Sequence, residues 1–204
     1  GGPRRSVVAL DAGTGELQWV HGEDEGERAA SAPRLLSGRG LSYWTDGTDA
    51  RIFYVTLGFR LVSLDAATGR RMLDFGTDGR IDLKAAAVYG EGRSIDPVSG
   101  EIGLHATPTV AGDVVVVGGA FADAPAPPTH NNTKGLVQAF DVRSGERLWT
   151  FRTVPGPGEV GHETWVNDSW GVNGNNGVWT QISVDADLGI VYLPVETPTG
   201  DYYG

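Results

Sequence analysis

Three side chains outside the repeated part of the sequence are of types that can bind a charged or flat ligand. Arg39 lies in a Gly-rich turn, and a guanidinium group can grip a carboxylate through two parallel hydrogen bonds. Trp179 offers a flat π-face that can hold a planar ring and exclude water from it. Asp123 leads from an apolar run into a loop, where its carboxylate could bind calcium, which prefers hard oxygen ligands. Each residue also has an ordinary alternative: a surface arginine, a packing tryptophan and a loop aspartate.

Several other kinds of site find little support. The four histidines lie at no metal-binding spacing, and a chain without cysteine has no disulfide, no thiol nucleophile and no cysteine-bound zinc. Neither a phosphate-binding Gly-rich loop nor a Gly-x-Ser-x-Gly nucleophile motif occurs. The formal net charge of -10, from 16 basic and 26 acidic residues, argues against nucleic acid as a partner.

The elements that position these side chains are expected to be short β-strands. The 204 residues include 31 glycines and 11 prolines, while 40% are hydrophobic, so turns are frequent and a packed core is still possible. Short apolar runs bounded by Gly, Asp or Pro predict strands at residues 51–56, 114–117 and 190–195. Composition and pattern together predict an all-β fold.

A repeated hairpin is the clearest signal of organisation. The pattern apolar-Asp-x-x-Thr/Ser-Gly-x-x-x-apolar occurs at residues 10–19, 64–73 and 140–149. Asp can hydrogen-bond its own turn, Thr or Ser reinforces that turn, and Gly supplies a positive φ, so each copy predicts two strands joined tightly. Trp19 and Trp149 occupy equivalent places in two copies, which predicts a packing role for both.

The spacing of the copies favours a β-propeller, which recurs in blades of about 40–50 residues. The aspartates of the three copies are 54 and 76 positions apart, as expected for blades with insertions. We therefore expect one domain, residues 1–204, which supplies about three to four blades and forms the N-terminal portion of a larger propeller. Long loops are expected at residues 22–38, 83–103, 122–134 and 155–177, and loops of this length are often functional.

Motifs along nearly the whole chain resemble a known family. Ser37-Gly38-Arg39-Gly40-Leu41-Ser42-Tyr43-Trp44, the repeat at residues 60–69, residues 164–170 and the strand at 189–195 occur in the same order as in the pyrroloquinoline quinone (PQQ)-dependent dehydrogenases. These are the eight-bladed quinoprotein alcohol and glucose dehydrogenases of bacteria. The resemblance implies an eight-bladed quinoprotein β-propeller with PQQ and Ca²⁺ as cofactors.

The resemblance also assigns roles to single residues. Arg39 is similar to the family's arginine that contacts a carboxylate of PQQ, and Trp179 resembles the tryptophan beneath the quinone ring. His105 aligns near a cofactor-contacting threonine. Asp123 falls where relatives place an acidic calcium ligand, and Thr197 takes the place of an asparagine ligand. Thr at that position, together with the absence of the adjacent-cysteine disulfide of methanol oxidisers, favours the glucose-oxidising branch.

The family oxidises an alcohol or sugar hydroxyl by hydride transfer to PQQ, assisted by calcium and an aspartate base. By alignment that aspartate lies beyond Gly204, so no residue of this chain is assigned as catalytic, and the chain alone is expected to be inactive. The resemblance further implies a periplasmic location, ubiquinone or cytochrome c as electron acceptor, and any membrane attachment through a segment outside this one.

Two functions of other classes remain open from the residues themselves. A non-catalytic β-propeller could use the same hairpins as a scaffold for protein–protein interaction in the bacterial envelope, and a propeller could also serve as a hydrolase or lyase. Arg39, Asp123 and Trp179 discriminate between these functions, because a scaffold has no need to direct all three toward one pocket.

Overall fold

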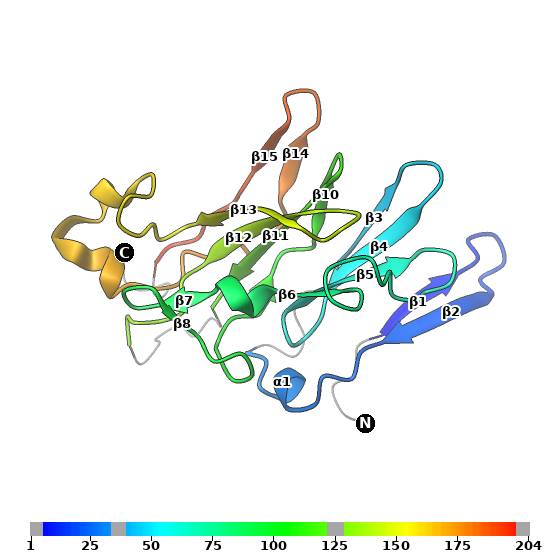
Figure 1. Ribbon diagram of the computed structural model, residues 1–204, viewed down its shortest axis with the longest axis horizontal. Helices are drawn as coiled ribbons and strands as arrows, with labels where there is room; N and C mark the ends of the chain where they lie inside the picture. Colours follow the sequence, from blue (N-terminus) through cyan, green and yellow to red (C-terminus); the bar gives the residue numbers. More distant parts are fainter. Residues whose placement is uncertain (1–5, 34–39, 122–128, 199–204) are drawn as a thin grey trace.

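The protein is built from antiparallel sheets that follow one another in chain order, and a computed structural model describes residues 6–33, 40–121 and 129–198 (Figure 1). Two sheets are complete blades with the orders β3-β4-β5-β6 and β10-β11-β12-β13, and short β9 pairs with the end of β11 in the second. The hairpins β1-β2 and β14-β15 flank these two blades. This arrangement is that of a β-propeller, as the sequence predicts.

The first flanking hairpin and the first blade comprise β1 (Ser6–Leu10), β2 (Leu17–Gly22), β3 (Leu41–Thr45), β4 (Ala50–Val55), β5 (Arg60–Asp65) and β6 (Arg80–Asp82). The second blade and the other hairpin comprise β9 (Leu104–His105), β10 (Thr109–Ala111), β11 (Val114–Ala120), β12 (Leu136–Asp141), β13 (Arg147–Arg152), β14 (Ser183–Asp185) and β15 (Ile190–Tyr192). Strands predicted at residues 51–56, 114–117 and 190–195 are confirmed as β4, β11 and β15.

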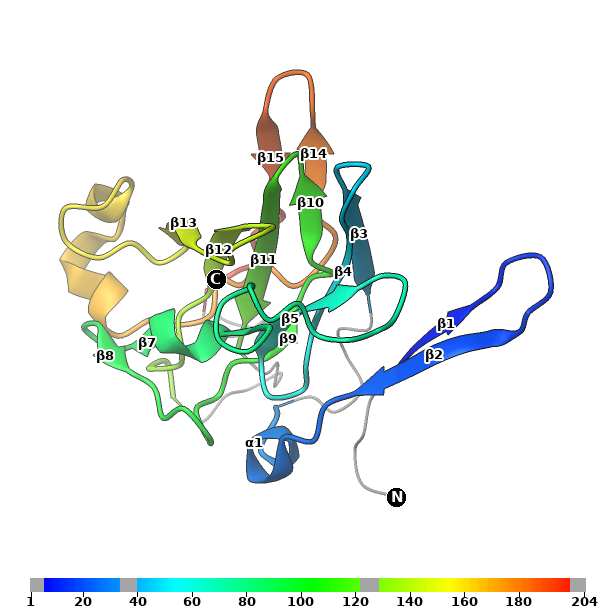
Figure 2. The same ribbon diagram turned by 45° about the vertical axis from the view of Figure 1, so that its right-hand side comes forward.

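Three of the long predicted loops contain short elements in their described parts. The helix α1 (Gly26–Ala30) lies below the sheets in Figure 2, and a two-stranded sheet and three 3-10 helices occur farther along the chain. The described helices include none long and apolar enough to cross a membrane. These elements are β7 (Val88–Tyr89), β8 (Arg93–Ser94), η1 (Leu83–Ala86), η2 (His162–Thr164) and η3 (Val166–Gly171).

The blades pack face to face, so their central strands are buried on both sides. In β11, Val115 and Val117 join the core between the two blades, whereas Val116 joins the core toward β14-β15. In β4, Phe53 faces the first of these cores and Tyr54 the third, which lies toward β1-β2. Because alternate side chains point to opposite faces of a sheet, this burial explains why the central strands are apolar without alternation.

The repeated aspartates form the turns that the sequence predicts. The Oδ1 atoms of Asp11, Asp65 and Asp141 accept hydrogen bonds from the backbone N–H three residues later, at 2.8, 2.7 and 2.7 Å. The Thr or Ser hydroxyl at that position donates to the same oxygen atom. These N–H groups also lower the pKa of Asp11 and Asp141. Asp96 makes the same turn with Ser99, a further copy that the sequence analysis missed.

The turn of one blade receives an aromatic side chain from the blade before it. Trp19 on β2 lies over the turn of the first blade, where its Nε1 donates to the carbonyl oxygen of Ala66 at 3.1 Å. A Cβ atom on Gly69, which has φ 69°, would lie 2.4 Å from Cε3 of that indole. Phe75 occupies the equivalent junction, next to Gly145 in the second blade. The packing role predicted for Trp19 is therefore confirmed.

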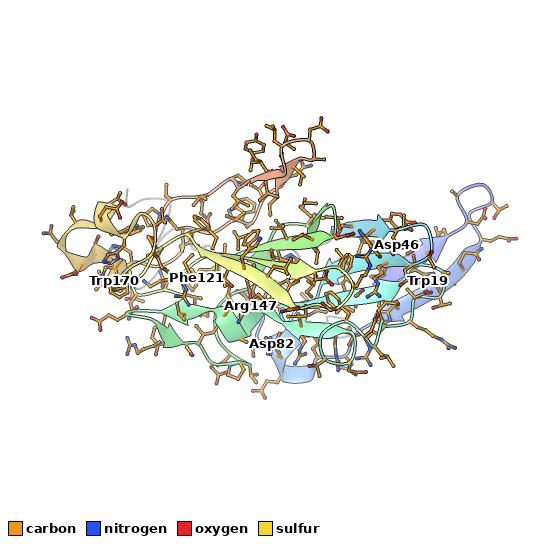
Figure 3. All side chains as sticks on the ribbon, turned by 45° about the horizontal axis from the view of Figure 1, so that its top comes forward. Trp19, Asp46, Asp82, Phe121, Arg147 and Trp170 are labelled. Carbon is orange, nitrogen blue, oxygen red and sulfur yellow. The ribbon has the colours of Figure 1, made fainter. Side chains whose placement is uncertain are left out.

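Trp149 differs from Trp19, although the two share a place in the repeat. It lies on β13, is 38% exposed and belongs to none of the three cores of the described residues. Figure 3 shows Trp19 near one end of the molecule and Arg147, which opens β13, close to its middle. The packing role predicted for Trp149 therefore stays a prediction.

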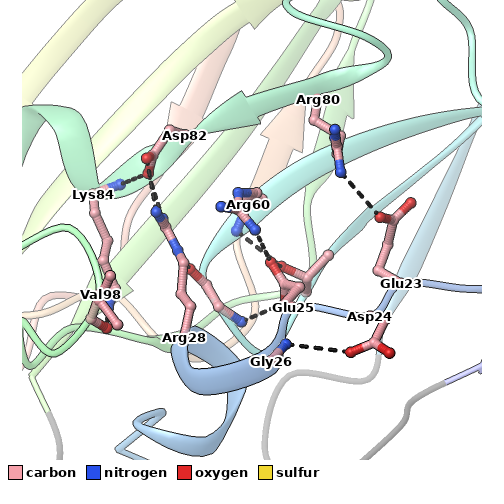
Figure 4. Close-up of polar contacts among 12 residues, drawn as sticks. Glu23, Asp24, Glu25, Gly26, Arg28, Arg60, Arg80, Asp82, Lys84 and Val98 are labelled. Carbon is pink, nitrogen blue, oxygen red and sulfur yellow. Dashed lines mark hydrogen bonds and ion pairs between the residues drawn. The ribbon is translucent and has the colours of Figure 1, made fainter.

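A buried carboxylate anchors the segment around α1 to the first blade (Figure 4). The Glu25 side chain, which is 4% exposed, accepts hydrogen bonds from Gly58 N, Thr56 Oγ1 and Arg60 Nη1 at 2.7, 2.9 and 2.7 Å. Nearby, Arg28 donates to the Gly58 carbonyl oxygen and pairs with Asp82. These contacts fix the chain before residues 34–39, which lie outside the described ranges.

Aromatic docking can be tested with two glycines of equivalent position. Gly69→Ala should lower the free energy of unfolding by about 3 kcal/mol, because the new methyl group overlaps Trp19 and the left-handed backbone disfavours Ala. Gly15→Ala has nearly the same φ, 75°, but open space around it, so about 1 kcal/mol is expected. Urea unfolding measures both values. Equal losses would show that the indole contributes nothing at this junction.

The Glu25 anchor gives a second prediction. Glu25→Gln should lower the free energy of unfolding by about 3 kcal/mol, since it leaves the Arg60 cation without its buried partner. Glu27→Gln, on the exposed side of the same helix, should change it by less than about 0.5 kcal/mol. Thermal unfolding of the two variants checks this. A Glu25→Gln loss as small as that of the control would contradict the anchoring role.

Candidate functional site

The three predicted site residues that the structure describes, His105, Trp179 and Thr197, fall at the same end of neighbouring sheets. Strands β10 and β11 are antiparallel, so the segment that enters β10 and the segment that leaves β11 share one end of their sheet. The same holds for β14 and β15. His105 precedes β10 and Trp179 precedes β14, while Thr197 follows β15. The fold therefore places the three described candidates at equivalent strand ends.

Several of these segments meet at the end of β11. On β9, His105 pairs with Gly119, and the Gly103 N–H donates to the Ala120 carbonyl oxygen at 3.2 Å. From the segment before β14, Val178 N–H donates to the Gly119 carbonyl oxygen at 3.4 Å. A Cβ atom on Gly177 would lie 2.0 Å from the Cβ atom of Ala120. The segment before β14 can therefore approach the end of β11 this closely only because residue 177 is glycine.

Trp179 presents part of its indole to solvent while its edge is held. The side chain is 42% exposed, and its Nε1 donates to Oε2 of Glu196 at 2.6 Å. Glu196 is itself tied to the same segment, because its N–H donates to the Gly177 carbonyl oxygen at 3.1 Å. The carboxylate thus restrains the orientation of the indole, and much of the residue stays exposed.

Glu196 is a site residue that the sequence analysis missed. It precedes Thr197, a predicted metal ligand, but a single carboxylate in a loop gives no sign of its partner. The signal that could have found it is its position directly after a strand, next to a candidate metal ligand.

His105 lies away from the exposed indole. Its side chain is 3% exposed, its ring centroid lies 6.1 Å from that of Phe59, and its Nδ1 lies 2.8 Å from the Ala106 carbonyl oxygen. Gly118 faces Val178, whereas Gly119, which pairs with His105, faces Phe59. Since neighbouring strand residues point to opposite faces, His105 faces the core between the two blades. Its contact with a cofactor stays a prediction.

The remaining candidates are described only in part. Arg39 and Asp123 lie outside the described ranges, so their roles stay predictions. Gly40, which follows Arg39, lies against Thr107, because a Cβ atom on residue 40 would sit 1.7 Å from Thr107 Oγ1. Thr197 is exposed and its metal-binding role also stays a prediction.

The described residues fit one face of a flat aromatic cofactor. An oriented and accessible indole suits stacking on a planar ring. No cluster of three or more His, Asp or Glu side chains suitable for a metal ion occurs within residues 6–33, 40–121 and 129–198. Two hollows, of about 480 and 450 Å³, are lined by other residues, including Arg147 on β13, and so lie away from Trp179.

Comparison with known proteins identifies the family. The PQQ family model, described as the glucose/ethanol/alcohol dehydrogenase β-propeller domain, matches residues 2–204. The chain belongs to this family. It is 29% identical over 98% of its length to the glycerol dehydrogenase large subunit of Gluconobacter oxydans, and the match covers 26% of that relative. Quinoprotein glucose dehydrogenase A of Acinetobacter calcoaceticus is 25% identical over 98% of the chain and 25% of its own length. The quinate/shikimate dehydrogenase (quinone) of Acinetobacter baylyi is 25% identical over 99% of the chain and 26% of its own length.

This chain of the PQQ β-propeller family thus spans about a quarter of the length of the curated relatives it matches. The expected family and fold class are confirmed. The matches cover both flanking hairpins as well as the two complete blades.

A buried cation supports the segment that carries Trp179 in this PQQ-family chain. Lys134 is 3% exposed, and its Nζ donates to the carbonyl oxygens of Trp170 and Asn173. Burial lowers the pKa of Lys134 from 10.5 to about 8. Its backbone bridges to Asn175, four residues before Trp179.

The lowered pKa of Lys134 predicts an unusual pH dependence. Between pH 8 and 10.5 the unfolded chain holds more protons at this residue than the folded chain, so the free energy of unfolding should rise with pH. Lys134→Met removes this contribution. The free energy of unfolding of the wild type minus that of the variant should therefore increase from pH 7.5 to 9.5, by at most about 1.4 kcal/mol per pH unit. Chemical unfolding at several pH values measures the difference, and a constant difference would contradict the shift.

Proposed function

We propose that this chain forms part of the cofactor site of a quinoprotein oxidoreductase that oxidises a hydroxyl group of a sugar or an alcohol. Bound PQQ would supply the two-electron acceptor for this oxidation. Three lines support the proposal: the family, the convergence of chain segments at the end of β11, and the oriented indole of Trp179. The indole is the single observation that carries it.

The chain's own residues would bind and orient the cofactor. Trp179 would stack on one face of the planar ring and exclude water from that face. Glu196 would keep the indole from rotating, because its carboxylate already accepts the indole N–H. Arg39 is proposed to bind a cofactor carboxylate through its guanidinium fork. His105 is also proposed to contact the cofactor, from the side of β11 that faces Phe59.

Calcium is proposed as a second bound group, with Asp123 and Thr197 as oxygen ligands from loops that follow β11 and β15. No residue of this chain is proposed as the catalytic base. Similarity to glycerol, glucose and alcohol dehydrogenases supports a small hydroxylated substrate. The glucose-oxidising branch is proposed from Thr197 and from the absence of cysteine. We further propose ubiquinone or cytochrome c as electron acceptor and the periplasm as location.

Removal of the indole tests the proposal. In the full-length protein with Ca²⁺ present, Trp179→Ala should weaken PQQ binding about tenfold or more, because the stacking surface is lost. Trp149→Ala removes a similarly exposed indole, 38% against 42%, from the outer strand β13 and should change the affinity less than twofold. Isothermal titration of the apo-protein with PQQ measures both affinities.

Two results would contradict the proposal. A wild-type protein that binds no PQQ in the presence of Ca²⁺ would favour the scaffold function, since a scaffold needs no redox cofactor. Equal affinity of the wild type and Trp179→Ala would remove the indole from the site.

A further inference from the structure

Lys134 is a cation buried without a carboxylate partner among the described residues. Its Nζ donates to two backbone carbonyl oxygens, those of Trp170 and Asn173, and lies 6.0 Å from the centre of the Trp170 ring. Burial of a charged group is costly unless hydrogen bonds compensate it. The two carbonyl groups provide this compensation, so they and the ammonium group hold one another in place.

Both carbonyl groups belong to the end of a helical turn. Trp170 is in η3, Asn173 lies two residues beyond that helix, and the Asn173 side chain donates to the Ser169 carbonyl oxygen at 2.9 Å. The last carbonyl groups of a helical turn lack internal donors and carry partial negative charge. Lys134 supplies the missing donors from a distant part of the chain and fixes the point where η3 gives way to the next segment.

That next segment is strained and needs support. Asn175 and Asn176 both have left-handed backbones, with φ values of 59° and 58°. Residues other than glycine rarely adopt this conformation. Hydrogen bonds hold Asn175 on two sides: its N–H donates to the Thr133 carbonyl oxygen at 2.9 Å, and its carbonyl oxygen accepts from Gly135 N–H at 2.6 Å. Lys134 lies between these two partners in the chain.

We propose that Lys134 is a positioning residue for the indole of Trp179. Its side chain anchors residues 170–173 and its flanking residues anchor Asn175, so together they keep the strained turn at residues 175–176 from relaxing. Trp179 follows this turn by three residues, and Glu196 secures its other side. The inference rests on the proposed PQQ site and adds the residue that sets the place of the stacking surface.

Lys84 offers a matched control within the same chain. It is also 3% exposed, its Nζ donates to the Val98 carbonyl oxygen at 2.9 Å, and its pKa is likewise lowered to about 8, chiefly by burial. Lys84 belongs to η1, in the neighbourhood of Arg28 and Asp82 (Figure 4). It therefore reproduces the burial of a lysine without contacting the segment that leads to Trp179.

The test compares Lys134→Met and Lys84→Met in the full-length protein. Titration with PQQ in the presence of Ca²⁺ should show at least a fivefold loss of affinity for Lys134→Met and less than a twofold change for Lys84→Met. The near-ultraviolet circular dichroism of apo Lys134→Met should differ from that of the apo wild type, because the substitution changes the surroundings of Trp170 and Trp179. Melting temperatures of both variants report any general loss of stability.

A milder variant covers the case in which Lys134→Met does not fold. Asn173→Ala loosens the same turn without burying a new group, and it should weaken PQQ binding in the same direction by a smaller factor. Unchanged PQQ affinity in the folded variant, or an equal loss in Lys84→Met, would overturn the positioning role. A wild type that binds no PQQ would instead overturn the proposed function, so the two failures are distinguishable.

Discussion

Burial of the central strands on both faces is the constraint on which the rest of this structure depends. A sheet such as β10-β11-β12-β13 has a core on each side, and Val115 and Val116 serve different cores although they are neighbours in the chain. Shifting such a strand by one residue would exchange the two sets of side chains. The register is therefore fixed, and so is the level at which every strand ends. The residues that lead into one strand and the residues that follow its antiparallel neighbour therefore lie at the same end of the sheet. This is why Trp179, before β14, and Glu196, after β15, can meet.

The segments beyond the strand ends are held differently, by charge and by single backbone contacts. Glu25 holds the chain around α1 through three donors, and Lys134 holds the end of η3 through two acceptors. Each is a buried charge that satisfies backbone or side-chain groups from another part of the chain. The apolar cores thus set where the blades lie, and buried charged groups set where the connecting segments go.

Local chemistry explains how much could be predicted. The Asp-x-x-Thr/Ser-Gly turn is complete within five residues, so Asp11, Asp65 and Asp141 could be interpreted from sequence, and the apolar run at Val114 was sufficient to predict β11. The copy at Asp96 fits the same pattern over residues 95–104, so it was equally open to prediction from the sequence. Of the candidate site, Trp179 could be proposed from sequence, whereas its bond to Glu196 and the embedding of Lys134 depend on contacts across 17 and 36 positions. Such contacts leave no periodic signature. The burial of His105 against Phe59 was equally beyond the sequence, since it depends on which face of β11 the short β9 presents.

The two blade junctions use different aromatic residues for the same purpose. An indole from β2 covers the turn at Gly69. The first blade has the exposed Leu73 at the corresponding place and instead covers Gly145 of the second blade with Phe75. Neighbouring repeats of similar sequence are prone to exchange equivalent pieces while they fold. Here an exchanged hairpin would bring a bicyclic ring to a socket shaped for a phenyl ring, or the reverse. The divergence between copies thus disfavours the pairing of a blade with the wrong neighbour during folding.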